Sequence, residues 1–254
     1  MKNTLVVING SHPCVTVQKA LELKGIEYRT VEVLPGVQPL LKPFFGGRTV
    51  PALRFSDGTK VQGSRAILAE LDKRQPEPPL YGSPEILEAE RWGDEHYQGT
   101  PRAILWPALA RHGEVLHAFQ AGSKLPALPM PAVKASGPGI FAIERKLNAT
   151  NDDVAKATIA TLPDLLDHVD GLIADGVLGG SEPNAADLQI APTTRLLHSV
   201  ADLRPLIAGR PAESHAFQYL EPAQAEVPAG IIDPSWLAGV RTSDASAAAA
   251  PANA

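Results

Sequence analysis

Strand and helix signals alternate in the first eighty residues in an order that few folds can accommodate. Residues 4–8 (TLVVI) form a short β-branched run, which is typical of a buried strand. Ser11 suits the N-cap of a following helix, Pro13 its first turn and Gly25 the position after its end. Residues 28–33 (YRTVEV) have strand character again, so the chain begins with a β-α-β unit.

A hairpin and a further helix follow this unit. Residues 50–55 (VPALRF) predict a strand, and the turn at Asp57-Gly58 leads into a second strand that starts at Thr59. Ser64 is placed to cap the helix RAILAELDKR, whose apolar residues share one face. A β-α-β unit followed by a β-β-α unit predicts an α/β domain of the thioredoxin-like type.

A proline-rich stretch separates this domain from a remainder in which no series of strands is visible. We predict a thioredoxin-like domain over residues 1–75, a linker over 76–84 (PEPPLYGSP) and an all-α domain over 85–240. The low-complexity segment 241–254 is predicted to be disordered.

Within the all-α domain the helical signals differ in strength. Residues 85–105 predict a helix interrupted by prolines, and residues 152–175 carry apolar side chains at helical spacing. Asn184 and Asp187 predict a capping box at the start of a last strong helix. Residues 120–139, rich in Pro, Gly, Ala and Lys, predict an irregular excursion that could close over a site.

Composition excludes several classes of protein and of partner. The net charge of −5 argues against a nucleic-acid partner, because phosphate binding needs a basic surface. Cys14 is the one cysteine, which excludes an intrachain disulfide and a Cys-rich zinc site. The histidines show no metal-ligand spacing, and no apolar run suits a signal peptide or a membrane helix. We therefore expect a cytoplasmic protein without a metal, nucleic-acid or membrane partner.

Residues 10–14 (GSHPC) join the first strand to the first helix, where a helix N-terminus stabilises a thiolate. The Ser11 hydroxyl could donate a hydrogen bond to the sulfur of a bound thiol, or serve only as an N-cap. Cys14 is either a reactive thiol or a small buried residue. His12 could tune a sulfur atom or lie partly exposed in the loop.

Two further segments offer backbone groups to a ligand. A cis bond at Val50-Pro51 would expose the Val50 backbone to an extended peptide, whereas a trans bond would be an ordinary strand start. Residues 62–65 (QGSR) begin a helix, where free N–H groups and the Ser64 hydroxyl could bind a carboxylate or simply cap the helix.

Together these segments resemble the glutathione transferase family, in its cytosolic, serine-type, bacterial-like form. The resemblance is carried by GSHPCVTVQKALELKGIEY, RTVPALRFSDGTKVQGSRAILAELD and SEPNAADLQIAPTTRLL. It covers residues 3–210 except 115–145. It implies the glutathione transferase fold, with a thioredoxin-like domain that binds the thiol of glutathione, an all-α domain that binds an electrophile, and a homodimer.

The resemblance also implies roles for individual residues. Ser11 corresponds to the serine that activates the glutathione thiol, and Ser64 to the hydroxyl that binds the γ-glutamyl carboxylate. Val50 pairs its backbone with the cysteinyl part, Pro51 is the cis-proline, and Arg48 approaches the glycyl carboxylate. The implied glutathione site comprises Ser11, Arg48, Val50, Pro51, Gln62, Gly63, Ser64 and Arg65.

Gly63 departs from the family pattern, which has Glu, Asp or Gln there to hold the γ-glutamyl amine. Gln62 could substitute, the other subunit could supply the group, or the ligand could be another small thiol such as mycothiol. The electrophile pocket is expected between the two domains. Its candidate lining residues are His12, Trp92, His96, Tyr97, Trp106 and Phe119.

The expected function is that of a glutathione transferase in detoxification, with glutathione as co-substrate. It would conjugate the thiol to a hydrophobic electrophile such as an epoxide, an activated halide or an unsaturated carbonyl. One alternative is a thiol-disulfide oxidoreductase that depends on Cys14, although Ser11 occupies the position of a catalytic cysteine in this fold. The other is a non-catalytic binding or scaffold protein, which the Gly63 departure supports.

Overall fold

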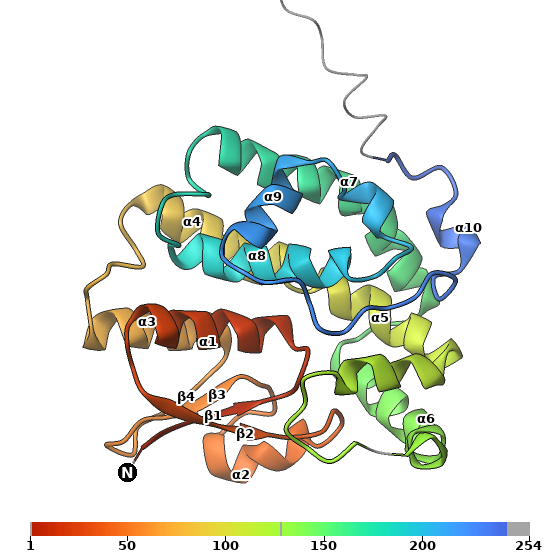
Figure 1. The fold of residues 1–254 in the computed structure, drawn as a ribbon, viewed down its shortest axis with the longest axis horizontal. Helices are drawn as coiled ribbons and strands as arrows, with labels where there is room; N and C mark the ends of the chain where they lie inside the picture. The colour runs from red at the N-terminus through yellow and green to blue at the C-terminus, as the bar shows by residue number, and fades with distance from the viewer. Residues whose placement is uncertain (1, 128, 243–254) are drawn as a thin grey trace, which may run out of the picture.

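The computed structural model of the protein describes residues 2–127 and 129–242, in which a small sheet lies beside a larger body of helices (Figure 1). In chain order its elements are β1 (Asn3–Val7), α1 (His12–Leu23), β2 (Tyr28–Glu32), η1 (Gln38–Leu41), α2 (Lys42–Phe45), β3 (Ala52–Arg54), β4 (Lys60–Gln62), α3 (Ser64–Arg74), α4 (Pro84–Trp92), η2 (Gly93–Tyr97), α5 (Thr100–Arg111), η3 (Gly113–Gln120), α6 (Met130–Leu147), α7 (Asp152–Ala174), α8 (Ala185–His198), η4 (Arg204–Leu206), α9 (Pro211–Gln218) and α10 (Pro234–Leu237). From residue 243 onward, the tail predicted to be disordered lies outside the described residues.

The sheet has four strands in the order β2-β1-β3-β4. β1 pairs with β2 in parallel and with β3 in antiparallel, and β3 forms the predicted hairpin with β4. From Thr4 to Val7 every residue of β1 is buried, because this central strand is covered on both faces. The predicted thioredoxin-like arrangement of this α/β part is confirmed.

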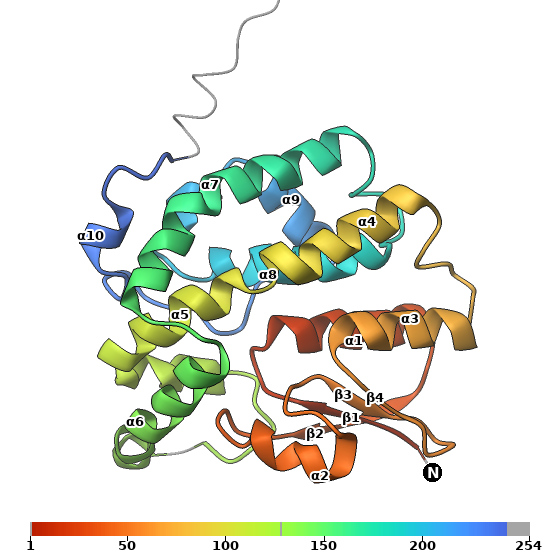
Figure 2. The same ribbon diagram turned by 180° about the vertical axis from the view of Figure 1, so that it is seen from behind.

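Helices cover the two faces of the sheet differently. α1 and α3 lie together between the sheet and the helical part, whereas α2 lies on the opposite face (Figures 1 and 2). One apolar core joins β1, α1 and α3 with Ala185 and Leu188 of α8, and a second core lies within the helical part. No helix among the described residues is both long and apolar enough to span a membrane.

The predicted capping box at the start of α8 is confirmed. The Asn184 side chain accepts a hydrogen bond from the Asp187 N–H at 3.0 Å, and the Asp187 carboxylate accepts one from the Asn184 N–H at 2.9 Å. The buried Asp187 also accepts from the Gly179 N–H and lies 2.7 Å from His215 Nε2. Asp187 therefore fixes α8 to two other segments, which is a structural role.

The single helix predicted over residues 85–105 is divided into α4 and α5 by the π-helical turn Gly93–Tyr97. Pro101 lies in the first turn of α5, where a missing N–H leaves no hydrogen bond unmade. At Gly93 an added Cβ would lie 3.0 Å from Ile190 Cγ1, so glycine allows this turn to approach α8 closely.

The irregular excursion predicted over residues 120–139 is corrected in its second half, because α6 begins at Met130. The glycines and prolines of this segment lower its helical propensity. However, Val133 and Phe141 bury one face of α6, and at Gly137 an added Cβ would lie 3.1 Å from the Phe141 ring. Burial of that face outweighs the weak propensity.

The proline-rich stretch between the two parts is held to α1 by Lys24. The Lys24 ammonium is fully buried and lies 2.7 Å from Asp72 Oδ1. It also donates hydrogen bonds to the carbonyls of Gln75 at 2.6 Å, Pro76 at 3.3 Å and Pro78 at 2.6 Å. A buried ammonium is tolerated because each of its hydrogens has a partner. The domain limits set within this stretch stay a prediction.

Candidate functional site

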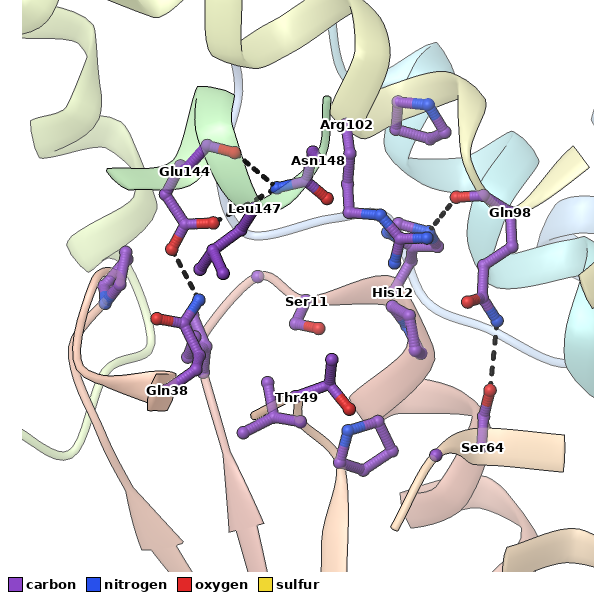
Figure 3. A pocket seen from close by; sticks show the side chains of 18 of the residues that line it. Ser11, His12, Gln38, Thr49, Ser64, Gln98, Arg102, Glu144, Leu147 and Asn148 are labelled. Carbon is purple, nitrogen blue, oxygen red and sulfur yellow. Dashed lines mark hydrogen bonds between the residues drawn. The ribbon is translucent and has the colours of Figure 1, made fainter. Parts of the chain in front are cut away.

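A cavity of about 750 Å³ lies between the sheet-bearing part and the helices α5 and α6 (Figure 3). One wall consists of the β1–α1 turn, the segment before β3 and the start of α3. The other wall consists of residues from α5, η3 and α6, together with the turn before α5. Every residue of the implied glutathione site lies in the first wall: Ser11, Arg48, Val50, Pro51, Gln62, Gly63, Ser64 and Arg65.

Ser11 occupies the N-cap position of α1, but its side chain makes no capping hydrogen bond. Its backbone is extended, with φ −74° and ψ 113°, and the side chain is half-buried in the cavity wall. The hydroxyl oxygen of a capping serine normally accepts a hydrogen bond from a backbone N–H group of the first turn. The hydroxyl of Ser11 is therefore not used as a cap, and it lies in the cavity wall at the positive end of α1, where the Cys14 thiol is its hydrogen-bonding neighbour.

His12 lines the same wall and is buried, rather than partly exposed in a loop. Its Nε2 lies 2.9 Å from the Gln98 carbonyl oxygen, and because a carbonyl only accepts, Nε2 carries the hydrogen. Burial, together with the nearby charge of Arg102, lowers the pKa of His12 to about 3. His12 is therefore neutral at physiological pH and joins α1 to the helical part.

Cys14 is buried in the core between the sheet and α8 and does not line the cavity. Burial raises the pKa of its thiol to about 11, although hydrogen bonding with the Ser11 side chain opposes this shift. A protonated, buried thiol is a poor nucleophile. The structure thus favours the small buried residue over the reactive thiol.

The peptide bond between Val50 and Pro51 is cis, as the resemblance implies. Within the described residues, neither the N–H nor the C=O of Val50 has a hydrogen-bond partner, although Val50 lies in the cavity wall. The Pro51 carbonyl, by contrast, accepts from the Gly63 N–H at 2.9 Å. Val50 therefore presents an unpaired backbone edge to which an extended peptide could add.

Ser64 is the first residue of α3 rather than its cap, because the N-cap position belongs to Gly63. The Ser64 side chain is buried, and its Oγ accepts a hydrogen bond from Gln98 Nε2 at 3.0 Å. A hydroxyl that accepts one bond still has its own hydrogen to donate. Ser64 is thus oriented to donate to an anion at the N-terminus of α3.

The other polar side chains of this wall differ in how free they are. The Gln62 amide donates to the Thr49 carbonyl, which directs it to the loop before β3. Arg65 is ion-paired with Glu90 on α4 at 2.8 Å. Arg48 is exposed and has no partner among the described residues. Only Arg48 of these three is therefore unengaged.

Glu90 is fully buried where α3 meets α4. Burial raises the pKa of its carboxyl to about 7 from an ordinary value of 4.5, although Arg65 opposes this shift. This ion pair joins the two sides of the molecule close to the cavity.

The structure divides the six residues expected to line the electrophile pocket into two groups. His12, Trp106 and Phe119 line the cavity, but Trp92, His96 and Tyr97 do not. Trp92 and Tyr97 stack on each other, with ring centroids 5.6 Å apart, and Tyr97 is fully buried. They face inward because Trp92 also packs against His168 of α7 and the Tyr97 hydroxyl lies 2.9 Å from Thr194 Oγ1 of α8. His96 is exposed.

Much of the helical wall was not predicted. It consists of Asp94, Gln98, Arg102, Leu105, Leu109, Leu116, Glu144, Leu147, Asn148 and Leu196, in addition to prolines and the aromatic residues above. Glu144 is buried and accepts hydrogen bonds from the Gly36 N–H at 2.9 Å and from the Gln38 side chain, which fixes α6 to the loop after β2. Helical periodicity would have placed Leu105 and Leu109 on one face of α5. Nothing in the sequence signals Gln98 or Glu144.

No group of three or more His, Cys, Asp or Glu that could hold a metal occurs in the described part of the chain.

Comparison with known proteins agrees with this geometry. Residues 5–79 match the model of the glutathione S-transferase N-terminal domain. No curated protein matches the chain. Among solved structures, the chain is similar to beta-etherase LigF from Sphingobium sp. strain SYK-6 (17% identity, TM-score 0.56, covering 78% of this chain and 84% of that one). It is also similar to glutathione transferase F2 from Populus trichocarpa (16% identity, TM-score 0.56, covering 85% of this chain and 91% of that one).

Maleylacetoacetate isomerase from Anaeromyxobacter dehalogenans 2CP-1 also has a similar structure (17% identity, TM-score 0.53, covering 96% of this chain and 95% of that one). At such identities the likeness concerns the fold. Residues 5–79 thus belong to the family of glutathione S-transferase N-terminal domains, and the chain as a whole has the glutathione transferase fold.

Proposed function

We propose that the protein binds glutathione, or a related small thiol, and transfers it to an electrophile held against the helical wall. The observation that carries this proposal is the convergence, on one cavity wall, of three groups that could bind a ligand. These are the hydroxyl of Ser11, the backbone edge of Val50 and the donor hydrogen of Ser64.

Each of these groups suits one part of a short thiol peptide. The Val50 N–H and C=O would pair with its cysteinyl residue, as an added strand pairs with a sheet edge. Ser64 and the free N–H groups of α3 would bind the γ-glutamyl carboxylate. Arg48, which is exposed at the cavity mouth, would approach the glycyl carboxylate.

The γ-glutamyl amine needs an acceptor that Gly63 lacks. Gln62 is directed away from it by its bond to Thr49. Asp94 lines the cavity beside the start of α3, and burial raises the pKa of its carboxyl. We assign the amine to Asp94, because its carboxylate acts on Arg65 at the start of α3, whereas the cavity's other carboxylate, Glu144, lies against the loop after β2.

In the reaction, Ser11 would donate a hydrogen bond to the thiolate, with the N-terminus of α1 as additional stabilisation. The thiol proton leaves to water, because the lowered pKa of His12, about 3, makes its imidazole too weak a base to take the proton. The sulfur then forms a bond to the electrophilic carbon, and the electron pair of the bond that breaks departs with the leaving group. The protein contributes a lower thiol pKa and the proximity of the reactants.

The burial of Cys14 argues against the oxidoreductase alternative, because a mixed disulfide needs an accessible thiolate. Homodimer formation, implied by the family resemblance, is part of this proposal and can be measured by light scattering.

The test is calorimetric titration with reduced glutathione of the wild-type protein and of Ser64→Ala. We expect saturable binding that weakens about tenfold in the variant, because a hydrogen bond to a charged group is lost. A panel of neutral electrophiles then tests turnover. Absence of binding would contradict the proposal, and binding without turnover across the panel would favour the non-catalytic alternative.

A further inference from the structure

Arg102 is a charged side chain of the cavity wall to which the proposed chemistry gives no role. It lies in the first turn of α5 and is only partly exposed. Figure 3 shows its side chain extending from α5 into the cavity, toward Ser11 and His12. Within the described part of the chain its guanidinium makes no hydrogen bond, and no carboxylate oxygen lies within 4.0 Å of it.

The two other arginines of the cavity have different surroundings. Arg65 is ion-paired with Glu90, and Arg48 is exposed, so water satisfies its donors. A guanidinium has five N–H donors and stays protonated, and it is costly to withdraw from water without a partner. Burial lowers the pKa of Arg102, which reflects this cost. The cavity thus contains a cation whose bonding partner the described residues do not supply.

Two carboxylates of the cavity wall act on Arg102 only at a distance. Asp94 and Glu144 both attract its charge, but each accepts hydrogen bonds from other groups. Asp94 accepts from Gln189 Nε2 at 3.0 Å, and Glu144 accepts from the Gly36 N–H at 2.9 Å. Their negative charges partly balance the positive charge of Arg102, but they accept no hydrogen bond from it. An anion in the cavity could therefore accept hydrogen bonds from the Arg102 guanidinium.

The surface next to Arg102 is apolar. Three side chains follow it at helical spacing on the same face of α5: Leu105, Trp106 and Leu109. Phe119 of η3 adds to this surface. The helical wall therefore combines one cation, at the end nearer Ser11, with an extended apolar area.

We propose that the electrophile carries an anionic oxygen group, such as a carboxylate, which Arg102 binds while an apolar body lies along α5. The reaction of such a substrate rests on the proposed function, but the anion site does not depend on it. The predicted substrate class is an amphipathic acid rather than a wholly hydrophobic electrophile. A bidentate contact from Arg102 would also fix the orientation of the substrate.

The first experiment measures binding without glutathione, using two unreactive probes of the same shape. Calorimetry compares 4-methylbenzoate with its methyl ester on the wild type, Arg102→Gln, Arg102→Lys and Arg111→Gln. Arg111 lies on the same helix but is exposed and paired with Asp152 and Asp233, so it controls for charge. Circular dichroism confirms that each variant is folded.

We expect the wild type to prefer the acid, and Arg102→Gln to bind it 10–100-fold more weakly, because a charge-assisted contact is lost. The ester should change less than about threefold. Arg102→Lys should bind the acid with intermediate affinity, since lysine keeps the positive charge but cannot make the two parallel hydrogen bonds of a guanidinium. Arg111→Gln should match the wild type. Equal binding of acid and ester to the wild type, or an equal loss for both in Arg102→Gln, would overturn the proposal.

The second experiment separates this proposal from the proposed function. 4-(Chloromethyl)benzoate and its methyl ester react alike, since the thiolate forms a C–S bond as the C–Cl bond breaks and chloride leaves with the electron pair. Selective loss of kcat/KM for the acid in Arg102→Gln supports the proposal, whereas equal loss for both assigns Arg102 to the thiolate. If neither probe reacts but Arg102 still selects the unreactive acid, the proposed function fails and the anion site stands.

Discussion

The two walls of the cavity are built in different ways. The wall next to the sheet comes from three short segments, 10–13, 48–51 and 62–65, and it offers mainly backbone groups and hydroxyls at the starts of helices. The helical wall comes from segments far apart in the chain, and it offers side chains such as Arg102. Local backbone geometry determines the first wall, whereas the packing of whole helices determines the second. A family fold can therefore keep its thiol site while its second site varies.

The largest expected effect concerns the first wall, through Ser11→Ala. We expect kcat/KM for a neutral benzyl chloride with glutathione to fall about 10²–10³-fold, as when one preorganised donor to a developing anion is removed. The pKa of enzyme-bound glutathione, followed by thiolate absorbance near 240 nm, should rise accordingly.

Cys14→Ala is the matched control, because this residue lies one turn from Ser11 but outside the cavity. It should keep the wild-type rate. A loss of rate in Cys14→Ala together with full activity of Ser11→Ala would reverse the assignment and return the oxidoreductase alternative.

The second prediction concerns the buried ion pair between Arg65 of the first wall and Glu90 of α4. The pKa of Glu90 is about 7 in the folded protein against 4.5 for an ordinary carboxyl, so the folded state binds more protons between these values. The resulting stability is fully present below pH 4.5 and is lost as pH rises through 7, by about 3 kcal/mol in total. Urea unfolding of the wild type and Glu90→Gln at pH 5 and pH 8 measures this decline.

Glu90→Gln should remove most of the difference between the two pH values. Glu88→Gln, on the exposed face of the same helix, should leave the difference in place. If the wild type and Glu90→Gln lose equal stability between pH 5 and pH 8, Glu90 does not titrate near neutrality.

The third prediction tests how the first wall tolerates a side chain at Gly63. Its backbone, with φ +92° and ψ 139°, is one that glycine adopts readily, so Gly63→Ala should destabilise the protein by about 1–3 kcal/mol. No atom lies within 4 Å of an added Cβ, so Gly63→Glu should cost no more. The Glu variant should bind glutathione several-fold more tightly than the Ala variant, because its carboxylate can hold the amine. Equal affinities in calorimetry would show that Asp94 already meets that need.

The smallest effect is expected where the second wall supports the first. Gln98→Leu removes the hydrogen bond to Ser64 Oγ, so KM for glutathione should rise about threefold while kcat is unchanged. Gln218→Leu, an exposed glutamine of α9, is the control and should match the wild type. A fall in kcat alone would place Gln98 in the chemistry instead of in orientation.

The same contrast explains how much of the molecule could be predicted from the sequence. Ser11, Val50 and Ser64 stand at strand and helix ends, where turn and cap signals are strong, and the structure places all three on one cavity. Trp92 and Tyr97 were assigned to the pocket by residue type, but the π-helical turn and the contacts with α7 and α8 direct them inward. Those contacts depend on helices far apart in the chain, which local patterns do not encode.

In α6, tertiary contacts again override the local sequence pattern, because a segment predicted to be irregular is helical. Its glycines and prolines favour an irregular segment, and only the burial of its inner face makes it a helix. Glu144 and Leu147 of the cavity therefore could not be assigned. The domain limits within residues 76–84, the homodimer and the roles of the glutathione-binding residues stay predictions.

The buried ammonium of Lys24 has a consequence for how molecules would reach and leave the cavity. It fixes residues 75–78 to the end of α1, which opposes a separation of the two parts by a hinge at that stretch. At another edge of the cavity, Glu144 of α6 accepts hydrogen bonds from Gly36 and Gln38. We expect association and dissociation rates of glutathione to rise together in Gln38→Ala with little change in affinity, which stopped-flow fluorescence can measure. The entry of substrate and the release of product would thus be limited by a local opening of α6 instead of a movement of whole domains.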